Sequence, residues 1–301
     1  MMPSNTAIIR LTTASAIMCW LGLVLVDLMI GFELRNANVQ LGVPQFLSTL
    51  LLTGYILSLY FHYKHRLVSA DNLNFIELLW RVFVTGLIAT IVSVFIHFFL
   101  TFVVSGSKLA EDGLTLSLLY HINIGLILAF VISTFLVWKK LVLYQKTKSL
   151  LRTWQVFEYA ILASLLFHFV PHSRFDLPFS LIFAFILAMG FVITPNLKWV
   201  AFLNFKQKWK SILLVLLILL YLTYFLIYLN NQQWNELIIS DLTNHVSVIA
   251  IYSFIMLYAI ASLLVILFNL PTTSVFEQKL EEVVNFQRLS QSSQAGQNQE
   301  E

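Results

Sequence analysis

The 301-residue chain has few charged residues and a single cysteine. Lys, Arg, Asp and Glu together make up 11% of the sequence, whereas hydrophobic residues make up 59%. A soluble domain carries about 25% charged and about 45–50% apolar residues, so a water-soluble globule is excluded. The lone Cys19 excludes a disulfide-stabilised secreted fold. A net charge of +3 provides no phosphate-binding stripe, so a nucleic-acid partner is not expected.

Glycine- and cysteine-based catalytic motifs are also missing. The chain contains no P-loop, no GxSxG, no paired-cysteine motif and no glycine-rich dinucleotide turn, and its 10 glycines are scattered. The prolines lie in the N-terminal tail or close to the ends of apolar runs, rather than in their middles. We therefore predict no catalytic residue of a soluble type and no broken helix at a membrane midplane.

What the chain does have is a series of long apolar stretches. A helix needs about 20 apolar residues to cross the hydrocarbon core, and helices satisfy their own backbone groups in lipid. The sequence thus predicts an all-α polytopic transmembrane bundle, residues 1–269, in contact with the lipid bilayer. Its eight spans are expected at 13–32, 43–62, 79–104, 115–138, 154–172, 178–195, 211–230 and 246–269.

The distribution of basic residues predicts the orientation. Of the 18 Lys and Arg residues, 14 fall on the side that holds both termini and three on the other, while Arg81 lies inside the third span. This bias predicts cytoplasmic termini and an even number of spans. Five of the seven tryptophans fall near the predicted cytoplasmic interface, as in an aromatic belt: Trp80, Trp138, Trp154, Trp199 and Trp209.

Ionisable residues inside spans are costly, so each is a candidate site. With this orientation, one group falls in the outer half of the membrane: Asp27, His97, His121, His168, His172 and His245. Histidines in a partly wet outer pocket would titrate near neutral pH or bind a small ligand. The simpler interpretation is that they donate hydrogen bonds between helices or lie among the headgroups.

Three of these histidines occur in pairs of residues spaced four apart. His168 and His172 are four residues apart and share one helical face if Pro171 has not yet unwound the turn, and Ser93 and His97 have the same spacing. With Asp27, this set resembles the SxxxH, HxxxH and aspartate residues of membrane zinc hydrolases such as alkaline ceramidases and adiponectin-receptor-like proteins. The resemblance implies that any zinc would be held by His97, His168, His172 and Asp27. The chain departs from that family because Asp27 precedes the SxxxH helix.

Two further charges lie near the inner edge of the membrane. Arg81 and Glu158 are expected at similar depth on the third and fifth spans, where they would form an ion pair. Alternatively, Arg81 extends alone to the inner headgroups.

The C-terminal residues change in character. Pro271 follows the last span, and Ser274 lies three residues before Glu277, which is a capping box for a new helix within 270–290. Its apolar stripe includes Phe276, Leu280 and Val283 and would pair two chains in a short coiled coil, or else dock on the inner leaflet. Residues 291–301 read as a disordered linker.

Residues 267–291 resemble the junction of bacterial membrane-anchored signalling proteins that continue into a GAF sensor and a SpoIIE-type serine/threonine phosphatase domain. The resemblance implies a multi-pass sensory or anchoring input domain in a bacterial inner membrane, a homodimer through the C-terminal helix, and an output domain beyond this chain. Any phosphatase activity would belong to that output domain. An intramembrane zinc hydrolase and a small-solute transporter remain the alternatives.

Overall fold

The computed structural model describes residues 5–36, 42–68, 74–104, 113–145, 147–170, 176–230, 242 and 245–270. Within this part the chain is helical and has no strand. The elements are α1 (Asn5–Arg35), α2 (Gln45–Val68), α3 (Phe75–Phe99), the π-helical turn η1 (Leu100–Val104), α4 (Gly113–Val142), α5 (Lys148–Phe167), α6 (Leu177–Ile193), the 3₁₀ turn η3 (Lys198–Phe202), α7 (Phe205–Asn230) and α8 (Val246–Phe268).

The eight predicted spans are confirmed as helices of the described chain that are long and apolar enough to cross a membrane. Their ends differ from the prediction by up to two turns. Helix α4 continues to Val142, one turn beyond the predicted end, and α5 ends at Phe167, one turn before it. The chain leaves α5 early because the residue before a proline avoids helical geometry, and Pro171 follows closely.

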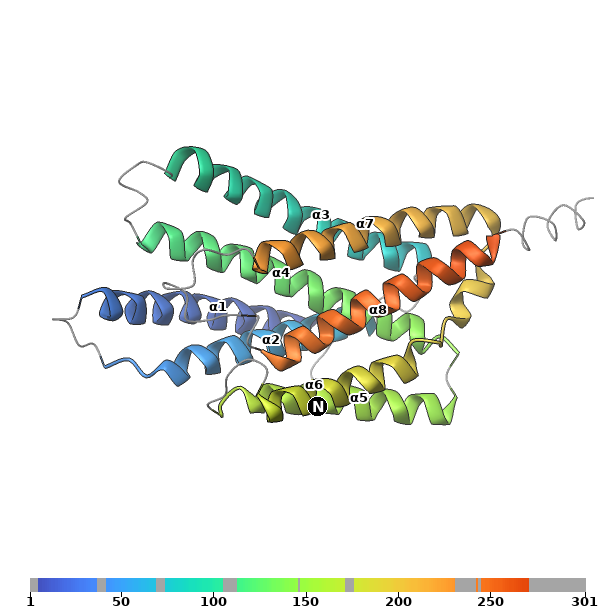
Figure 1. Ribbon diagram of the computed structural model, residues 1–301, viewed down its shortest axis with the longest axis horizontal. Helices are drawn as coiled ribbons and strands as arrows, with labels where there is room; N and C mark the ends of the chain where they lie inside the picture. Colours follow the sequence, from blue (N-terminus) through green and yellow to red (C-terminus); the bar gives the residue numbers. More distant parts are fainter. Residues whose placement is uncertain are drawn as a thin grey trace, which may run out of the picture.

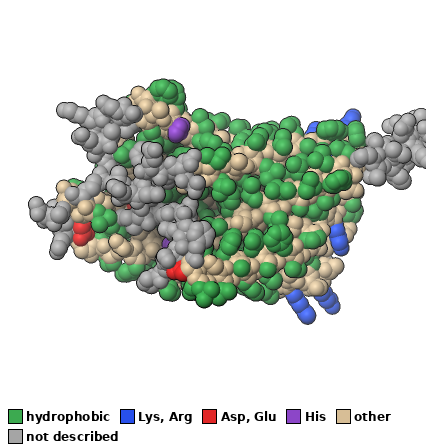
Figure 2. Space-filling view, in the orientation of Figure 1, with side chains coloured by type: hydrophobic (Ala, Val, Ile, Leu, Met, Phe, Trp, Pro, Cys, Tyr) green, Lys and Arg blue, Asp and Glu red, His purple; other side chains and the backbone are tan. Residues whose placement is uncertain are grey.

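The helices run side by side along one axis, and Figure 1 shows them as a single bundle. Helix α4 is central and packs against α1, α2, α3 and α8, whereas α5 and α6 pack on each other and on α8. The first and last described residues lie at the same end. Lys and Arg gather at that end of the visible face, and we call it the basic end (Figure 2).

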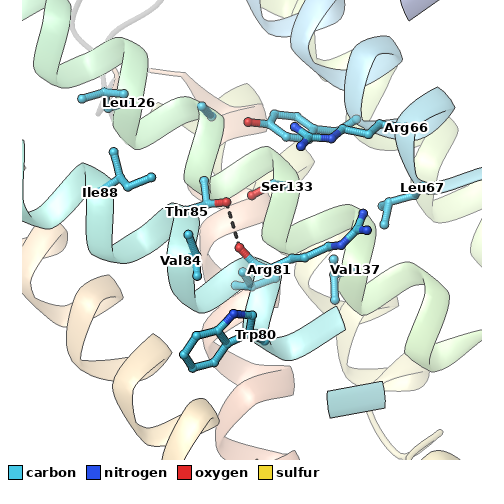
Figure 3. Close-up of a pocket in the computed structure, with 13 residues that line it drawn as sticks. Arg66, Leu67, Trp80, Arg81, Val84, Thr85, Ile88, Leu126, Ser133 and Val137 are labelled. Atoms are coloured by element: carbon cyan, nitrogen blue, oxygen red, sulfur yellow. Dashed lines mark hydrogen bonds between the residues drawn. The ribbon is translucent and has the colours of Figure 1, made fainter. Parts of the chain in front are cut away.

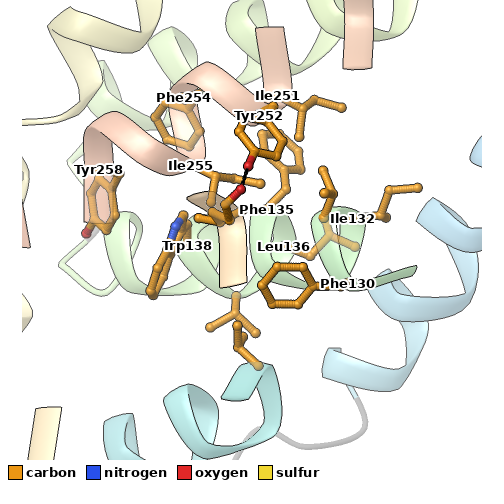
Figure 4. Packing of buried hydrophobic residues seen from close by; sticks show 14 of the residues in the cluster. Phe130, Ile132, Phe135, Leu136, Trp138, Ile251, Tyr252, Phe254, Ile255 and Tyr258 are labelled. Carbon is orange, nitrogen blue, oxygen red and sulfur yellow. Dashed lines mark hydrogen bonds between the residues drawn. The ribbon is translucent and has the colours of Figure 1, made fainter. Parts of the chain in front are cut away.

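Aromatic side chains fill the core of the basic half. Figure 4 shows Phe135 and Trp138 of α4 facing Phe254 and Tyr258 of α8. The indole of Trp199 on η3 donates a 3.0 Å hydrogen bond to the Tyr258 hydroxyl. These fully buried rings pack closely between α4 and α8 and leave little room for displacement there.

Only some of the five tryptophans near the basic end have the exposed positions of an interfacial aromatic belt. Trp138, Trp154 and Trp199 are completely buried, while Trp80 and Trp209 are exposed. The prediction that all five form an interfacial belt is therefore wrong for the three buried ones. These three side chains point into the bundle, because the position of a residue along a span does not determine the direction of its side chain.

Several predicted features lie outside the described residues. These are the joint and helix after the last span, with Pro271, Ser274, Phe276, Glu277, Leu280 and Val283, and the linker 291–301.

Candidate proton-binding site

A buried carboxylate and imidazole meet between α1 and α4. Nε2 of His121 lies 2.9 Å from Oδ2 of Asp27, and both side chains are almost fully buried. The Ser48 hydroxyl on α2 donates a 2.5 Å hydrogen bond to Oδ1 of Asp27. Three helices therefore converge on one carboxyl group.

Two further hydrogen bonds fix the helices around this pair. The indole of Trp20 on α1 donates to the His121 carbonyl at 3.0 Å, and the Tyr55 hydroxyl on α2 donates to the Gly125 carbonyl at 3.1 Å. A Cβ on Gly125 would lie 3.0 Å from the Trp20 indole nitrogen, so glycine permits this close approach. The junction is thus tied by backbone and side-chain contacts on both sides of the pair.

The hydrogen-bond partners of His121 indicate how many hydrogens the pair of Asp27 and His121 carries. Nδ1 of His121 lies 2.6 Å from the Ser117 carbonyl oxygen. A carbonyl oxygen only accepts, so Nδ1 carries a hydrogen in this arrangement. The contact between Nε2 and Asp27 then needs a proton of its own, either on an imidazolium or on a carboxylic acid. In both forms the pair is neutral overall and holds one dissociable proton.

Loss of that proton would have a large local effect. It would leave a lone pair of Nε2 facing a carboxylate oxygen 2.9 Å away, with a net negative charge inside the bundle. A buried unbalanced charge is expensive, so the junction would have to rearrange or take up water. The arrangement can therefore couple the release of one proton to the packing of α1, α2 and α4.

A second pair of imidazoles joins α5 to α8. His168 is the C-cap residue of α5 and His245 the N-cap residue of α8, and their rings stack with centroids 3.3 Å apart. His245 is almost fully buried. Of the predicted outer-half residues, the structure therefore brings together two pairs, Asp27 with His121 and His168 with His245.

The remaining predicted histidines do not join these pairs in the described chain. His97 is exposed on α3, and Ser93, four residues earlier, is buried against the Tyr224 hydroxyl at 3.1 Å. Helix α5 ends at Phe167, just before His168, and His172 lies outside the described residues, so the shared face of His168 and His172 stays a prediction. No group of three His, Cys, Asp or Glu side chains within the described ranges is close enough to hold a metal.

The predicted ion pair between Arg81 and Glu158 does not form. Glu158 is buried on α5 and accepts hydrogen bonds from Lys139 Nζ at 2.5 and 2.7 Å, and from the Tyr60 hydroxyl. Arg81 is exposed on α3. The prediction failed because Lys139 was placed outside the membrane, whereas the extra turn of α4 brings it to the depth of Glu158.

Sequence reasoning missed several polar residues around these groups. Ser48 and Lys139 contribute directly to the two carboxylate sites. Asn123 is completely buried two residues after His121, and its amide has no hydrogen-bond partner in the part of the chain that the structure describes. The available signal was the presence of small polar and amide side chains inside apolar runs, which a search limited to ionisable groups overlooks.

The fold and composition define the chain as an all-α, multi-pass membrane protein. No protein-family model, curated protein or solved structure matches it. Its function therefore has to be argued from the geometry of its own residues.

Proposed function

We propose that this protein is a membrane-embedded input domain that responds to protons through the pair formed by Asp27 and His121. The observation that carries the proposal is the 2.9 Å contact between these two buried side chains on different helices. A site that changes both its charge and its helix contacts on losing a proton meets the physical requirement for a sensor, because the two packings then bind the proton with different affinity.

The central position of α4 supports a route from this pair to the rest of the bundle. His121 lies on α4, which packs against α8 as well as α1 and α2. Displacement of α4 would therefore change its packing against α8. The N-cap residue of α8, His245, stacks on His168 of α5. Protonation of both stacked rings would add like charges at short range and favour a different α5–α8 contact.

The end of α8 would pass the change onward. The Lys208 ammonium on α7 donates a 3.2 Å hydrogen bond to the Asn269 carbonyl, at the C-cap of α8. A cation at this position stabilises the helix end. We propose that the segment after Asn269 carries the signal as the predicted C-terminal helix of a homodimer, with both termini in the cytoplasm of a bacterial cell. An output domain of GAF and SpoIIE type is the expected partner.

The test uses Trp20 as a reporter, because its indole is hydrogen-bonded to the His121 carbonyl. The purified chain in lipid nanodiscs is titrated from mildly acidic to alkaline pH, and the Trp20 signal is isolated by subtracting the spectrum of Trp20→Phe. We expect a fluorescence transition in the wild type as the proton is lost. Asp27→Asn and His121→Gln should remove it, because neither variant can form the same proton-linked pair.

His97→Gln is the matched control, because it removes an exposed histidine and leaves the buried pair intact. It should titrate like the wild type. An unchanged transition in a folded Asp27→Asn variant would overturn the proposal. Folding is verified by gel filtration and by the emission of the buried tryptophans.

A further inference from the structure

A lateral cavity lies near the basic end, away from the proton-binding pair. It has a volume of about 570 Å³ and is bounded by α2, α3 and α4. Figure 3 shows Arg66 entering from α2 and Arg81 from α3, with Thr85, Ile88, Leu126 and Ser133 along its length. Trp80 and Ile88 in its lining are about half exposed on the outer surface of the bundle, so the cavity faces the surrounding lipid.

The two arginines place positive charge at one end of this cavity. Arg66 belongs to the last turn of α2, and Arg81 lies six residues after the start of α3. At a rise of 1.5 Å per residue, Arg81 is about 9 Å along its helix, within reach of the headgroup region for a long side chain. Both are exposed, and neither forms an ion pair with a carboxylate of the described residues.

The rest of the cavity is apolar in character. The Ser133 hydroxyl donates to the Phe130 carbonyl and the Thr85 hydroxyl to the Arg81 carbonyl, so both donors are already used by their own helices. Val84, Ile88 and Leu126 supply hydrocarbon surface. The cavity therefore offers guanidinium donors to an anion at one end and an apolar wall along the helices.

A second cavity extends this surface. It has a volume of about 390 Å³ between α1, α2 and α4, and it shares Tyr63, Leu126 and Ala129 with the first. The two cavities therefore adjoin across one wall.

We infer that the cavity lined by Arg66 and Arg81 binds an anionic phospholipid of the leaflet at the basic end. The phosphate contacts the two guanidinium groups, and an acyl chain lies against Val84, Ile88 and Leu126. Guanidinium groups suit phosphate because they present paired donors in one plane. Basic pockets between transmembrane helices are a known physical basis for headgroup binding. A free anion would leave the apolar wall without a partner, so the occupant is a lipid.

The experiment measures lipid retention by native mass spectrometry. The protein is purified from nanodiscs containing equal amounts of phosphatidylglycerol and phosphatidylcholine. We expect the wild type to retain phosphatidylglycerol. The Arg66→Gln, Arg81→Gln double variant should bind phosphatidylglycerol roughly 30-fold more weakly, because each substitution removes one attraction between an arginine and the anionic headgroup. The control variant Lys206→Gln, Lys210→Gln removes the same charge from exposed positions of α7 and should behave like the wild type.

A second variant tests the apolar part while keeping both arginines. Ala129→Phe fills the wall shared by the two cavities and should also lower phosphatidylglycerol retention. Equal retention by the wild type and the double arginine variant would overturn the inference. So would displacement of the lipid by inorganic phosphate alone, because that result assigns a simple anion site.

Discussion

Asn123 is a single buried residue whose unpaired amide lowers the stability of the core around it. Its side chain is completely buried on α4, and both amide atoms lack a hydrogen-bond partner among the described residues. Glu158 is a contrasting case, because Lys139 and Tyr60 both donate to its carboxyl oxygens. A buried polar group that remains unpaired costs free energy, whereas a paired one can be close to neutral.

Replacing Asn123 by Leu should stabilise the protein. The two side chains have the same number and branching of non-hydrogen atoms, and the change removes an amide that is desolvated without compensation. We expect the free energy of unfolding to rise by about 1 kcal/mol, measured by thermal or denaturant unfolding in detergent. Thr134→Val is a suitable control, since the Thr134 hydroxyl is buried but donates to the Phe130 carbonyl. A destabilised Asn123→Leu would show that the amide has a structural role.

At the residue scale, the sequence identified Asp27, His121, His168 and His245 as outer-half groups but could not pair them. Partners on different helices depend on rotation of each helix about its axis, which a polar residue in an apolar run does not reveal. The wrong pairing of Glu158 with Arg81 has the same origin. A shift of one turn in the end of α4 was enough to hide Lys139 as the true partner.

Between elements, the side chains of α4 and α7 pack closely against α3 at Gly86. A Cβ at this position would lie 2.6 Å from Cδ2 of Tyr221 and 2.7 Å from Cε2 of Phe130. Both atoms belong to rings that pack on each other edge to face. Glycine is therefore required here by the close approach of two neighbouring helices.

Gly86→Ala should weaken this packing. Overpacking costs about 1–3 kcal/mol, and alanine returns up to about 1 kcal/mol in helix propensity, so we expect a net loss of about 1–2 kcal/mol in unfolding free energy. Gly22→Ala is the matched control, because its Cβ would meet only the flexible side chain of Leu51, whose two methyl carbons would lie at 3.1 and 3.4 Å. It should be neutral or slightly stabilising. Equal effects of the two changes would contradict this packing geometry.

The existence of the helices was predictable from the sequence because apolar length alone determines membrane-spanning helices. Their ends were harder to place. Local events such as the Thr147 side chain capping α5 through the Leu150 amide are decided by a few hydrogen bonds. The central position of α4 could not be predicted, because the apolar character of a helix does not show whether it faces lipid or other helices.

On the scale of the molecule, the described Lys and Arg residues gather at one end of the bundle (Figure 2). The basic end contains the aromatic core and the lipid-facing arginines, and the opposite end contains the two pairs of titratable side chains. If basic residues remain on the cytoplasmic side, the proton-binding pair reports on the outer half of the membrane.

Labelling with a membrane-impermeant maleimide tests this orientation. In a Cys19→Ser background, Asn36→Cys marks the less basic end and Lys206→Cys marks the basic end. We expect labelling of the first variant in intact cells and of the second only after the cells are opened. The reverse pattern would place the proton-binding pair in the inner half of the membrane and overturn the predicted orientation.

The central place of α4 also bears on how the chain is made. Synthesis proceeds from the N-terminus, so α1 and α2 are already in the bilayer when α4 emerges, and His121 can meet Asp27 and Ser48 at once. Lys139, on the same helix, must wait for Glu158 on α5. Translation of α5 should therefore be the step that seats α4 at its full depth, and arresting the ribosome before Glu158 should leave the last turn of α4 accessible to water.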